Sequence, residues 1–273
     1  MKLVPDFLTR PLRLRLKAVA DEARLFLPSH QDQASYCLKT PTSQATLPIP
    51  PLNLFADMAD SAEAFIQTGK IDVAGMNKVL QDSGYSLADA KRILDFGCAA
   101  GRMIRCLPEL TQAELWGVDI SAEHIQWCIN NLPMHFAVSS IVPHLPFEDR
   151  FFDLIYCGSI FTHIEDNRET WLLELARILK PGGVLYLTIH DEHTLKLFET
   201  GYKDRWLAKK VSNHPTYLEH KSGFDMLVIG RGWRSQVFYN SAYFRAKLPP
   251  VFSWTALVPE AYGYQSAVVL KKT

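Results

Sequence analysis

The chain has 273 residues, of which 48% are hydrophobic and 21% are charged, with 29 basic and 29 acidic residues. This composition is typical of a globular protein, and the zero net charge disfavours a general nucleic-acid binder, which needs a positive surface. The five cysteines show no C-x-x-C spacing. No leader with a long apolar core and no transmembrane run occurs, so we expect reduced thiols and a cytoplasmic location.

Residues 1–60 are predicted to form a helical lead and linker, ahead of a single domain over 61–273. Four basic residues and no acid lie between positions 10 and 17. Contact with a membrane surface or a partner is one interpretation, and a helix that covers the edge of the main domain is the other. Residues 61–84 show two short helical patterns, which we expect to form a lid over a bound ligand.

A short apolar run that ends in a glycine turn is the most informative feature of the chain. The segment Ile93–Arg102 reads ILDFGCAAGR, and a second apolar run ends in Asp119, 22 residues after Gly97. This order is the pattern of a nucleoside-binding α/β fold: a strand, a glycine turn, a helix, and then a neighbouring strand that ends in an acid. The glycines let the backbone approach the ligand, and the distal acid binds the ribose hydroxyls.

The charges around this turn indicate which nucleoside is bound. Asp95 lies two residues before Gly97, the spacing is G-x-A-x-G, and no lysine follows the turn. A phosphate site built from backbone N–H groups would be weakened by this carboxylate. An acid here suits a ligand with an ammonium and a sulfonium, and S-adenosylmethionine (SAM) is the common nucleoside that carries both. The alternative is a strand-to-helix turn that binds nothing.

Strands and helices are predicted to alternate through the middle of the chain, as in a parallel sheet with right-handed crossovers. The clearest helix is 167–180, with Asp166 as its cap and Glu169 three residues later. Two last strands should complete a seven-stranded sheet. The expected strands are 92–96, 115–119, 135–138, 153–157, 184–189, 252–257 and 265–270.

This part of the chain resembles the class I SAM-dependent methyltransferases, including a subgroup that tailors glycans and small molecules. Besides the glycine turn, the segments LPFEDRFFDLIYCGSIFTHI (Leu145–Ile164) and LARILKPGGVLYLTIH (Leu175–His190) are similar to that family. The resemblance implies an α/β, Rossmann-like sheet with helices on both faces and SAM as the cofactor, without a metal. The cofactor contacts are then expected at Asp95, Gly97, Cys98, Ala99, Gly101, Arg102, Asp119, Ile120, Ser139 and Cys157.

Two positions depart from the family pattern. Ala99 stands where the commonest pattern has glycine. The third strand lacks the acid that often holds the adenine amino group, and Ser139 or a backbone carbonyl is expected to replace it.

The segment 202–250, which follows a helix expected over 191–200, is aromatic and polar with hairpin-like runs. It is predicted to cover the substrate at the carboxyl ends of the strands, with a loop insertion without a ligand role as the alternative. Nine basic residues and three acids lie between positions 201 and 250. This excess favours an anionic acceptor in one interpretation and a solvated basic face in the other.

Methyl transfer needs little acid-base help, because the sulfonium is a strong electrophile and the protein mainly aligns the nucleophile and excludes water. A hydroxyl nucleophile, however, must lose its proton to a base. The candidates at strand ends are His163 and His190. We favour His190, while a structural role stays open for either.

The sequence therefore predicts a SAM-dependent methyltransferase that acts on oxygen or nitrogen of a small-molecule or sugar-like acceptor. Two other functions stay open. One is a non-catalytic SAM-binding or regulatory protein of the same fold, and the other is a methyltransferase whose acceptor is protein or RNA. The lack of an overall basic surface disfavours RNA.

Overall fold

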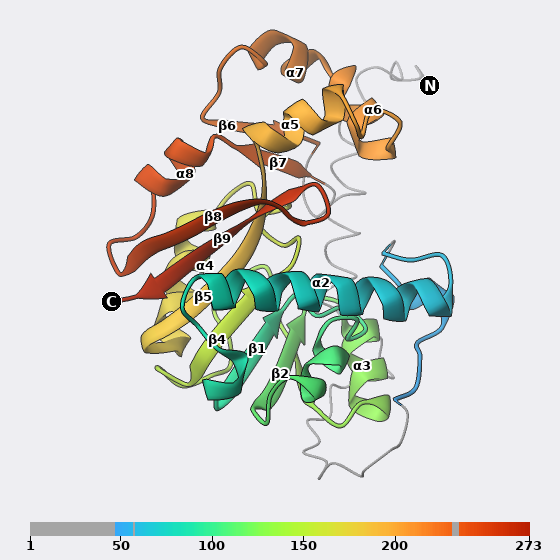
Figure 1. Ribbon diagram of the computed structural model, residues 1–273, viewed down its shortest axis with the longest axis vertical. Coiled ribbons are helices and arrows are strands. Elements are labelled where there is room, and N and C mark those ends of the chain that lie inside the picture. The colour runs from blue at the N-terminus through green and yellow to red at the C-terminus, as the bar shows by residue number, and fades with distance from the viewer. Residues whose placement is uncertain (1–46, 57, 231–234) are drawn as a thin grey trace, which may run out of the picture.

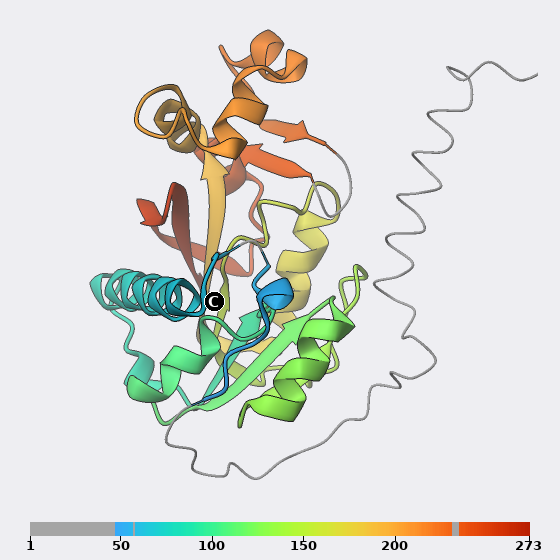
Figure 2. The same ribbon diagram turned by 90° about the vertical axis from the view of Figure 1, so that its right-hand side faces the viewer.

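The structure is a computed structural model that describes residues 47–56, 58–230 and 235–273 (Figures 1 and 2). Most of the predicted N-terminal lead, with its basic residues, lies outside the described residues. The strands are β1 (Arg92–Phe96), β2 (Glu114–Asp119), β3 (His135–Val138), β4 (Phe152–Cys157), β5 (Leu179–Asp191), β6 (Met226–Ile229), β7 (Gln236–Tyr239), β8 (Phe252–Tyr262) and β9 (Gln265–Lys272). The helices are α2 (Ala62–Asp82), α3 (Ala122–Asn131), α4 (Arg168–Ile178), α5 (Glu192–Glu199), α6 (Trp206–Ser212), α7 (Pro215–His220) and α8 (Ser241–Ala246), with short 3₁₀ helices at Leu52–Leu54, Leu87–Asp89 and Ile104–Glu109.

The central sheet has the order β3-β2-β1-β4-β5-β9-β8. Its first five strands are parallel, and β9 is antiparallel to both β5 and β8. The last two residues of β5 also pair with β7, which pairs with β6, so the described residues form nine strands instead of seven. The predicted strands are all present and the α/β class is confirmed. The two additional strands come from the hairpin-like runs of the segment 202–250.

Both faces of the sheet are buried, which explains the nearly continuous apolar runs of its strands. Successive residues of a strand point to opposite faces. Leu187 of β5 and Leu94 and Phe96 of β1 pack in the core that includes α4, whereas Tyr186 packs in the core that includes α2 and α3. Asp95, between Leu94 and Phe96, therefore lies on the α2 side of the sheet.

Residues 62–82 form one continuous helix, α2, rather than the two short helices expected. Ser61 caps its first turn through its hydroxyl, and buried apolar residues continue on one face past both glycines of the helix. At Gly69 a Cβ would lie 2.4 Å from the carbonyl oxygen of Arg102. The absence of a side chain at Gly69 thus lets α2 lie directly on the chain that follows the glycine turn.

Helix α4 is present as predicted, but its cap differs. The N-cap is Asn167, in the left-handed region with φ of 59°, and its side chain makes no capping hydrogen bond. The prediction that Asp166 caps the helix is wrong, because the chain turns one residue later. Asparagine is among the few residues that tolerate the left-handed region.

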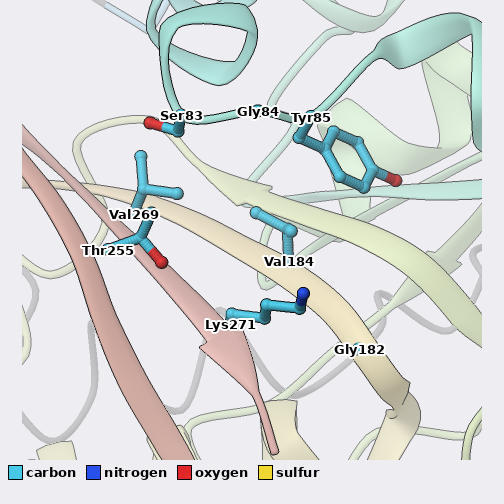
Figure 3. A pocket seen from close by; sticks show the side chains of 8 residues that line it. All are labelled: Ser83, Gly84, Tyr85, Gly182, Val184, Thr255, Val269 and Lys271. Atoms are coloured by element: carbon cyan, nitrogen blue, oxygen red, sulfur yellow. The ribbon is translucent and has the colours of Figure 1, made fainter.

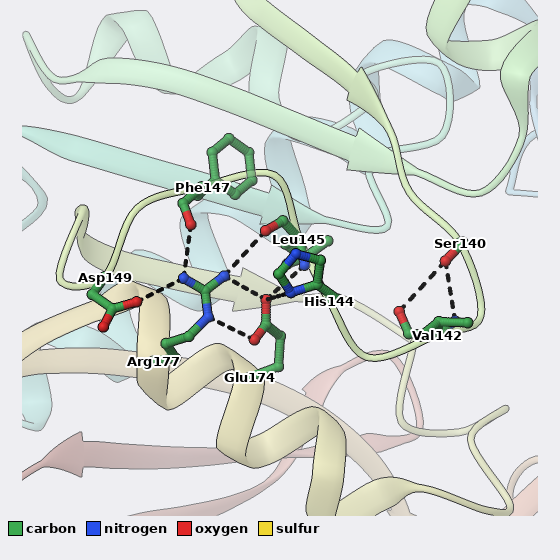
Figure 4. A network of polar contacts seen from close by, with 8 residues as sticks. All are labelled: Ser140, Val142, His144, Leu145, Phe147, Asp149, Glu174 and Arg177. Atoms are coloured by element: carbon green, nitrogen blue, oxygen red, sulfur yellow. Dashed lines mark hydrogen bonds and ion pairs between the residues drawn. The ribbon is translucent and has the colours of Figure 1, made fainter.

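Arg177, near the end of α4, holds the loop between β3 and β4 against that helix (Figure 4). Its guanidinium donates hydrogen bonds to the carbonyl oxygens of Leu145 and Phe147 at 3.1 and 2.8 Å. It also pairs with Glu174 at 2.7 Å and Asp149 at 2.8 Å. These contacts join all five residues, so this part of the family-like segment supports the fold.

Residues 192–230 and 235–251 form a cap at the carboxyl end of β5 (Figure 1). Its first helix, α5, starts with a capping box between Asp191 and Thr194. The cap has a small hydrophobic core of its own, separate from the two cores of the sheet. This core consists of Leu195, Phe198, Leu207, Ala208, Val211, Tyr217, Leu227, Ile229 and Phe238. The segment predicted to cover the substrate thus lies next to the carboxyl end of β5.

Candidate cofactor and acceptor site

The glycine turn after β1 and the acid at the end of β2 lie side by side. Gly97 N–H donates to the carbonyl oxygen of Val118 at 2.8 Å. One carboxylate oxygen of Asp119 accepts from Ala99 N–H at 2.9 Å, and the other accepts from Ser121 N–H at 2.8 Å. Asp119 is partly exposed, and each oxygen retains a lone pair. These free lone pairs fit the ribose hydroxyls of a nucleoside.

Gly97 and Gly101 have φ of 87° and 78°, a region that L residues avoid. A Cβ on Gly97 would lie 2.0 Å from Cδ1 of Ile160, and a Cβ on Gly101 would lie 2.6 Å from Cδ1 of Leu132. Close approach of a ligand is therefore not the only reason for glycine at these two positions. The protein itself fills the space above both glycines.

Ala99 also lies in the left-handed region, with φ of 44°. This conformation explains why glycine is the commonest residue at this position of the family pattern. The methyl group of Ala99 costs roughly 1–2 kcal/mol there. The hydrogen bond from Ala99 N–H to Asp119 stabilises the strained turn.

Asp95 is only 3% exposed, beneath the turn and on the α2 side of the sheet. Burial raises the pKa of Asp95 to about 7, although the Tyr156 hydroxyl and the Arg102 guanidinium favour its charged form. Arg102 has other partners as well, because Nη1 lies 2.6 Å from the Asp72 carboxylate and Nη2 donates to the Tyr262 hydroxyl at 2.5 Å. The charge of Asp95 is thus only partly compensated within the protein, which suits a cationic ligand group.

The other predicted cofactor residues come together only in part. Ser139 N–H donates to the carbonyl oxygen of Asp119 at 2.8 Å, and the partly exposed Ile120 follows that acid directly. Cys98 is buried in the core beneath the turn. Cys157 is fully buried in the core on the α4 side of the sheet. Its side chain therefore faces the other side of the sheet from Asp95, and a cofactor contact at Cys157 stays a prediction.

His163 follows β4 and is partly buried. Its Nδ1 lies 2.7 Å from the carbonyl oxygen of Ser235. A carbonyl only accepts, so Nδ1 carries the proton and Nε2 keeps a lone pair. Burial lowers the pKa of His163, and the ring is therefore neutral at pH 7.

His190 is 1% exposed, and its ring stacks on Phe238 at 4.8 Å between centroids and lies 5.7 Å from the ring of Tyr264. Neither ring nitrogen has a hydrogen-bond partner in the part of the chain that the structure describes. Burial, and then the proximity of His163, lower the pKa of His190 to about 3. His190 is thus a neutral ring enclosed under the cap, rather than an open group at the edge of the sheet.

Sequence reasoning missed a buried polar cluster at the ends of β4, β5 and β9. Ser159 N–H donates to Thr188 Oγ1 at 2.7 Å, Gln265 Nε2 donates to Ser159 Oγ at 2.8 Å, and Thr188 donates to Gln265 Oε1 at 2.6 Å. Thr162 Oγ1 lies 3.2 Å from Ser159 Oγ. The isolated polar Thr188 within the apolar run LYLTIH was a usable signal. Gln265 gave none, because its partners lie 77 and 106 residues away.

Two cavities lie away from this region. One is close to the amino ends of β1 and of the paired part of β5, at the opposite edge of the sheet (Figure 3), and is lined by Ser83, Gly84, Tyr85, Gly182, Val184, Thr255, Val269 and Lys271. The other lies between α7 and β6 on the cap and is lined by Thr216, His220, Gly223, Phe224, Asp225, Met226, Leu227 and Val228. Neither contains a predicted site residue, so we assign neither to the cofactor.

Within the described ranges, no cluster of three or more His, Cys, Asp or Glu residues could hold a metal ion. No helix in the same ranges is long and apolar enough to cross a membrane. The cysteines described by the structure, Cys98, Cys106, Cys128 and Cys157, are all free and buried.

Residues 94–187 match a family model described as a methyltransferase domain. The matched range contains the glycine turn, Asp119 and His163. The chain therefore contains a methyltransferase domain over residues 94–187. SAM is accordingly the cofactor of this domain, in agreement with the acid-flanked turn.

Several similar proteins are methyltransferases by name. Methyltransferase GfsG of Streptomyces halstedii is 28% identical over 154 residues, which cover 50% of this chain and 54% of that protein. Trans-aconitate 2-methyltransferase of Azoarcus sp. is 34% identical over 119 residues, or 41% of this chain and 45% of that protein. The chain spans about half the length of these curated relatives. Magnesium protoporphyrin IX methyltransferase of Synechocystis, solved with bound SAH, shares the fold with a TM-score of 0.52 at 15% identity, over 81% of this chain and 92% of that one.

Proposed function

We propose that this methyltransferase transfers the methyl group of SAM to oxygen or nitrogen of a small-molecule acceptor, with sugar-like and anionic compounds as the first classes to test. The observation that carries the proposal is the Asp119 carboxylate. It closes the glycine turn through Ala99 N–H and retains lone pairs for two ribose hydroxyls. A relative named for trans-aconitate, a small anionic acceptor, supports the choice of acceptor class.

Asp95, the turn and Asp119 would hold the cofactor in this proposal. Asp95 would bind the ammonium group and Asp119 the ribose, while Ser139 and Ile120 lie beside Asp119 on the side where adenine is expected. Bound SAM supplies an electrophilic methyl group on its sulfonium. The protein then has to align the acceptor atom and exclude water.

Where the acceptor atom is a hydroxyl, we assign its proton to His163 rather than to His190. A general base works best when its pKa lies near the operating pH, and a pKa of about 3 makes His190 a weak base. His163 has a fixed tautomer with a free Nε2 lone pair. Its place after β4, beside the polar cluster of Ser159, is also where an acceptor would meet the carboxyl edge of the sheet.

The basic residues of the cap would act on an anionic acceptor mainly at long range. Those that the structure describes, among them Lys203, Arg205 and Lys209, are exposed or partly exposed. Exposed cations raise the local concentration of an anion, and salt screens this effect. An anionic acceptor should therefore show a KM that rises with ionic strength, whereas a neutral acceptor should not.

The proposal is tested by incubating the purified protein with SAM and a panel of carboxylate, hydroxyl and amine compounds. The expected result is acceptor-dependent formation of S-adenosylhomocysteine (SAH), with the methylated product identified by mass spectrometry. Tight SAH binding without turnover on any small molecule, peptide or RNA would favour the non-catalytic alternative. Turnover only with protein or RNA would replace the small-molecule acceptor.

A further inference from the structure

The turn between β8 and β9 contacts the carboxyl-terminal end of the glycine turn. Tyr262, the last residue of β8, accepts a hydrogen bond from Arg102 Nη2 at 2.5 Å, and Arg102 directly follows Gly101. Arg102 and Tyr262 are 6% and 8% exposed, so water does not compete strongly for this bond. Asp72 of α2 pairs with the same guanidinium at 2.6 Å. The residue after the glycine turn is thus held from two sides.

The same β8–β9 turn also reaches the start of the glycine turn, indirectly, through the loop that follows β4. Gln265, the first residue of β9, binds Ser159 and Thr188 through its side-chain amide. Ser159 has φ of 59°, a strained conformation that persists only where neighbouring groups fix it. Ile160 follows Ser159, and its Cδ1 occupies the space above Gly97.

We propose that the β8–β9 turn is the positioning element of the cofactor site, with Tyr262 and Gln265 as positioning residues at its two ends. Tyr262 fixes the end of the glycine turn through Arg102. Gln265 fixes the start of the turn by holding Ser159 in its strained conformation, so that Ile160 lies over Gly97. The inference rests on the proposed placement of SAM at this turn.

The physical basis is preorganisation. A ligand that contacts backbone on both sides of a five-residue turn binds tightly only if the turn does not have to be ordered during binding. Neither Tyr262 nor Gln265 is expected to touch the cofactor. Their loss should therefore lower cofactor affinity through a disordered turn, while the chain remains folded by the three hydrophobic cores.

The test measures SAH binding by calorimetry, which needs no acceptor, together with the thermal midpoint of each variant. Tyr262→Phe removes one hydroxyl that is hydrogen-bonded to a charged group. Tyr217→Phe is the matched control, because the Tyr217 hydroxyl donates to Glu199 at 2.7 Å within the cap. Hydrogen bonds to charged groups are strong enough that we expect about a tenfold loss of SAH affinity for Tyr262→Phe and none for the control.

Gln265→Met removes both amide hydrogen bonds at similar side-chain length. Its control is Ser266→Ala, the neighbouring residue, which is 0% exposed and whose hydroxyl has no partner among the described residues. We expect SAH affinity to fall about five- to tenfold for Gln265→Met, in line with the loss of two buried hydrogen bonds, and to stay unchanged for Ser266→Ala.

The outcomes separate the two proposals. If the wild-type protein does not bind SAH, the proposed cofactor site itself is overturned. If the wild-type protein binds SAH and both Tyr262→Phe and Gln265→Met bind it as tightly, the positioning role is overturned. The positioning role is also overturned if the control variants lose as much SAH affinity for an equal fall in thermal midpoint. The loss of affinity would then reflect global destabilisation of the fold. Affinity lost only in Tyr262→Phe and Gln265→Met supports the proposal.

Discussion

The Asp119 carboxylate accepts a hydrogen bond from Ala99 N–H at 2.9 Å and so joins the end of β2 to the middle of the glycine turn. The acid that we assign to the ribose is therefore also a structural part of the turn. Ala99 has a positive φ, and the bond offsets part of the cost of that conformation. A substitution at Asp119 should consequently affect both the cofactor and the fold.

Asp119→Ala is expected to lower SAM affinity tenfold or more and to reduce the free energy of unfolding by roughly 1–3 kcal/mol, because it removes the acceptor of two backbone N–H groups as well as the ribose contact. Calorimetry and thermal denaturation of the same variant measure both effects. Glu109→Ala, which removes an exposed carboxylate, is the control. Unchanged SAM affinity in Asp119→Ala would place the nucleoside elsewhere.

Gly101→Ala is expected to destabilise the fold rather than only block the cofactor. The new Cβ would combine the cost of a positive φ with a 2.6 Å contact to Leu132, together about 2–5 kcal/mol. Gly84→Ala is a matched control, since Gly84 has φ of 79° and nothing within 4 Å of the added Cβ. It should show the backbone cost alone. Equal thermal midpoints of the two variants would contradict the packing explanation.

SAM affinity should depend on pH through Asp95. The pKa of Asp95 is about 7 in the folded protein and 3.8 in the unfolded chain. Between these two pH values the folded, cofactor-free protein binds one proton more than the unfolded chain. Its free energy of unfolding therefore falls as the pH rises through this window. An ammonium group requires the carboxylate form. SAM affinity should therefore fall by up to roughly tenfold per pH unit below pH 7.

Calorimetry at pH 7.5, 6.5 and 5.5 measures this dependence. Asp95→Asn is the control, and it should bind SAM more weakly at pH 7.5 but with little change across the series. A wild-type affinity that is flat from pH 7.5 to 5.5 would separate Asp95 from the ammonium group.

The two histidines should respond differently to substitution. His163→Asn is expected to lower the single-turnover rate with a hydroxyl acceptor by about 10² to 10⁴ and to leave SAM affinity intact. His190→Phe should keep the rate and should not lower the free energy of unfolding, because it preserves the stack on Phe238 and removes two unpartnered buried nitrogens. A chemical rate lost in His190→Phe and kept in His163→Asn would reverse the assignment.

Local sequence was sufficient to predict the turn and the acid at the next strand. ILDFGCAAGR combines an apolar run with glycines at a tight turn, and these preferences act over a few residues. The position of Asp119 followed from the length of one strand-helix-strand unit, which brings the ends of adjacent parallel strands together. The structure agrees, since Asp119 contacts Ala99 directly.

Helix caps and the helices around the sheet were predicted less accurately, because they depend on residues outside the helix itself. Two short helical patterns were expected over 61–84, but the structure has one continuous helix, whose Gly69 packs on Arg102. The pattern around Asp166 satisfied a capping box, but the turn was formed by Asn167. Both outcomes depend on contacts or turns that propensity within one element does not contain.

The sequence by itself determined the seven strands of the central sheet, the cofactor class and the place of the turn, because each depends on neighbouring residues and on a repeating pattern. Only the tertiary structure decided which side chains share a face or a cluster. It buried His190 under Phe238, placed Cys157 on the other side of the sheet from Asp95, and brought Gln265 to Ser159 across 106 residues. Such contacts arise from the packing of whole elements against one another, and no local pattern of residues encodes them.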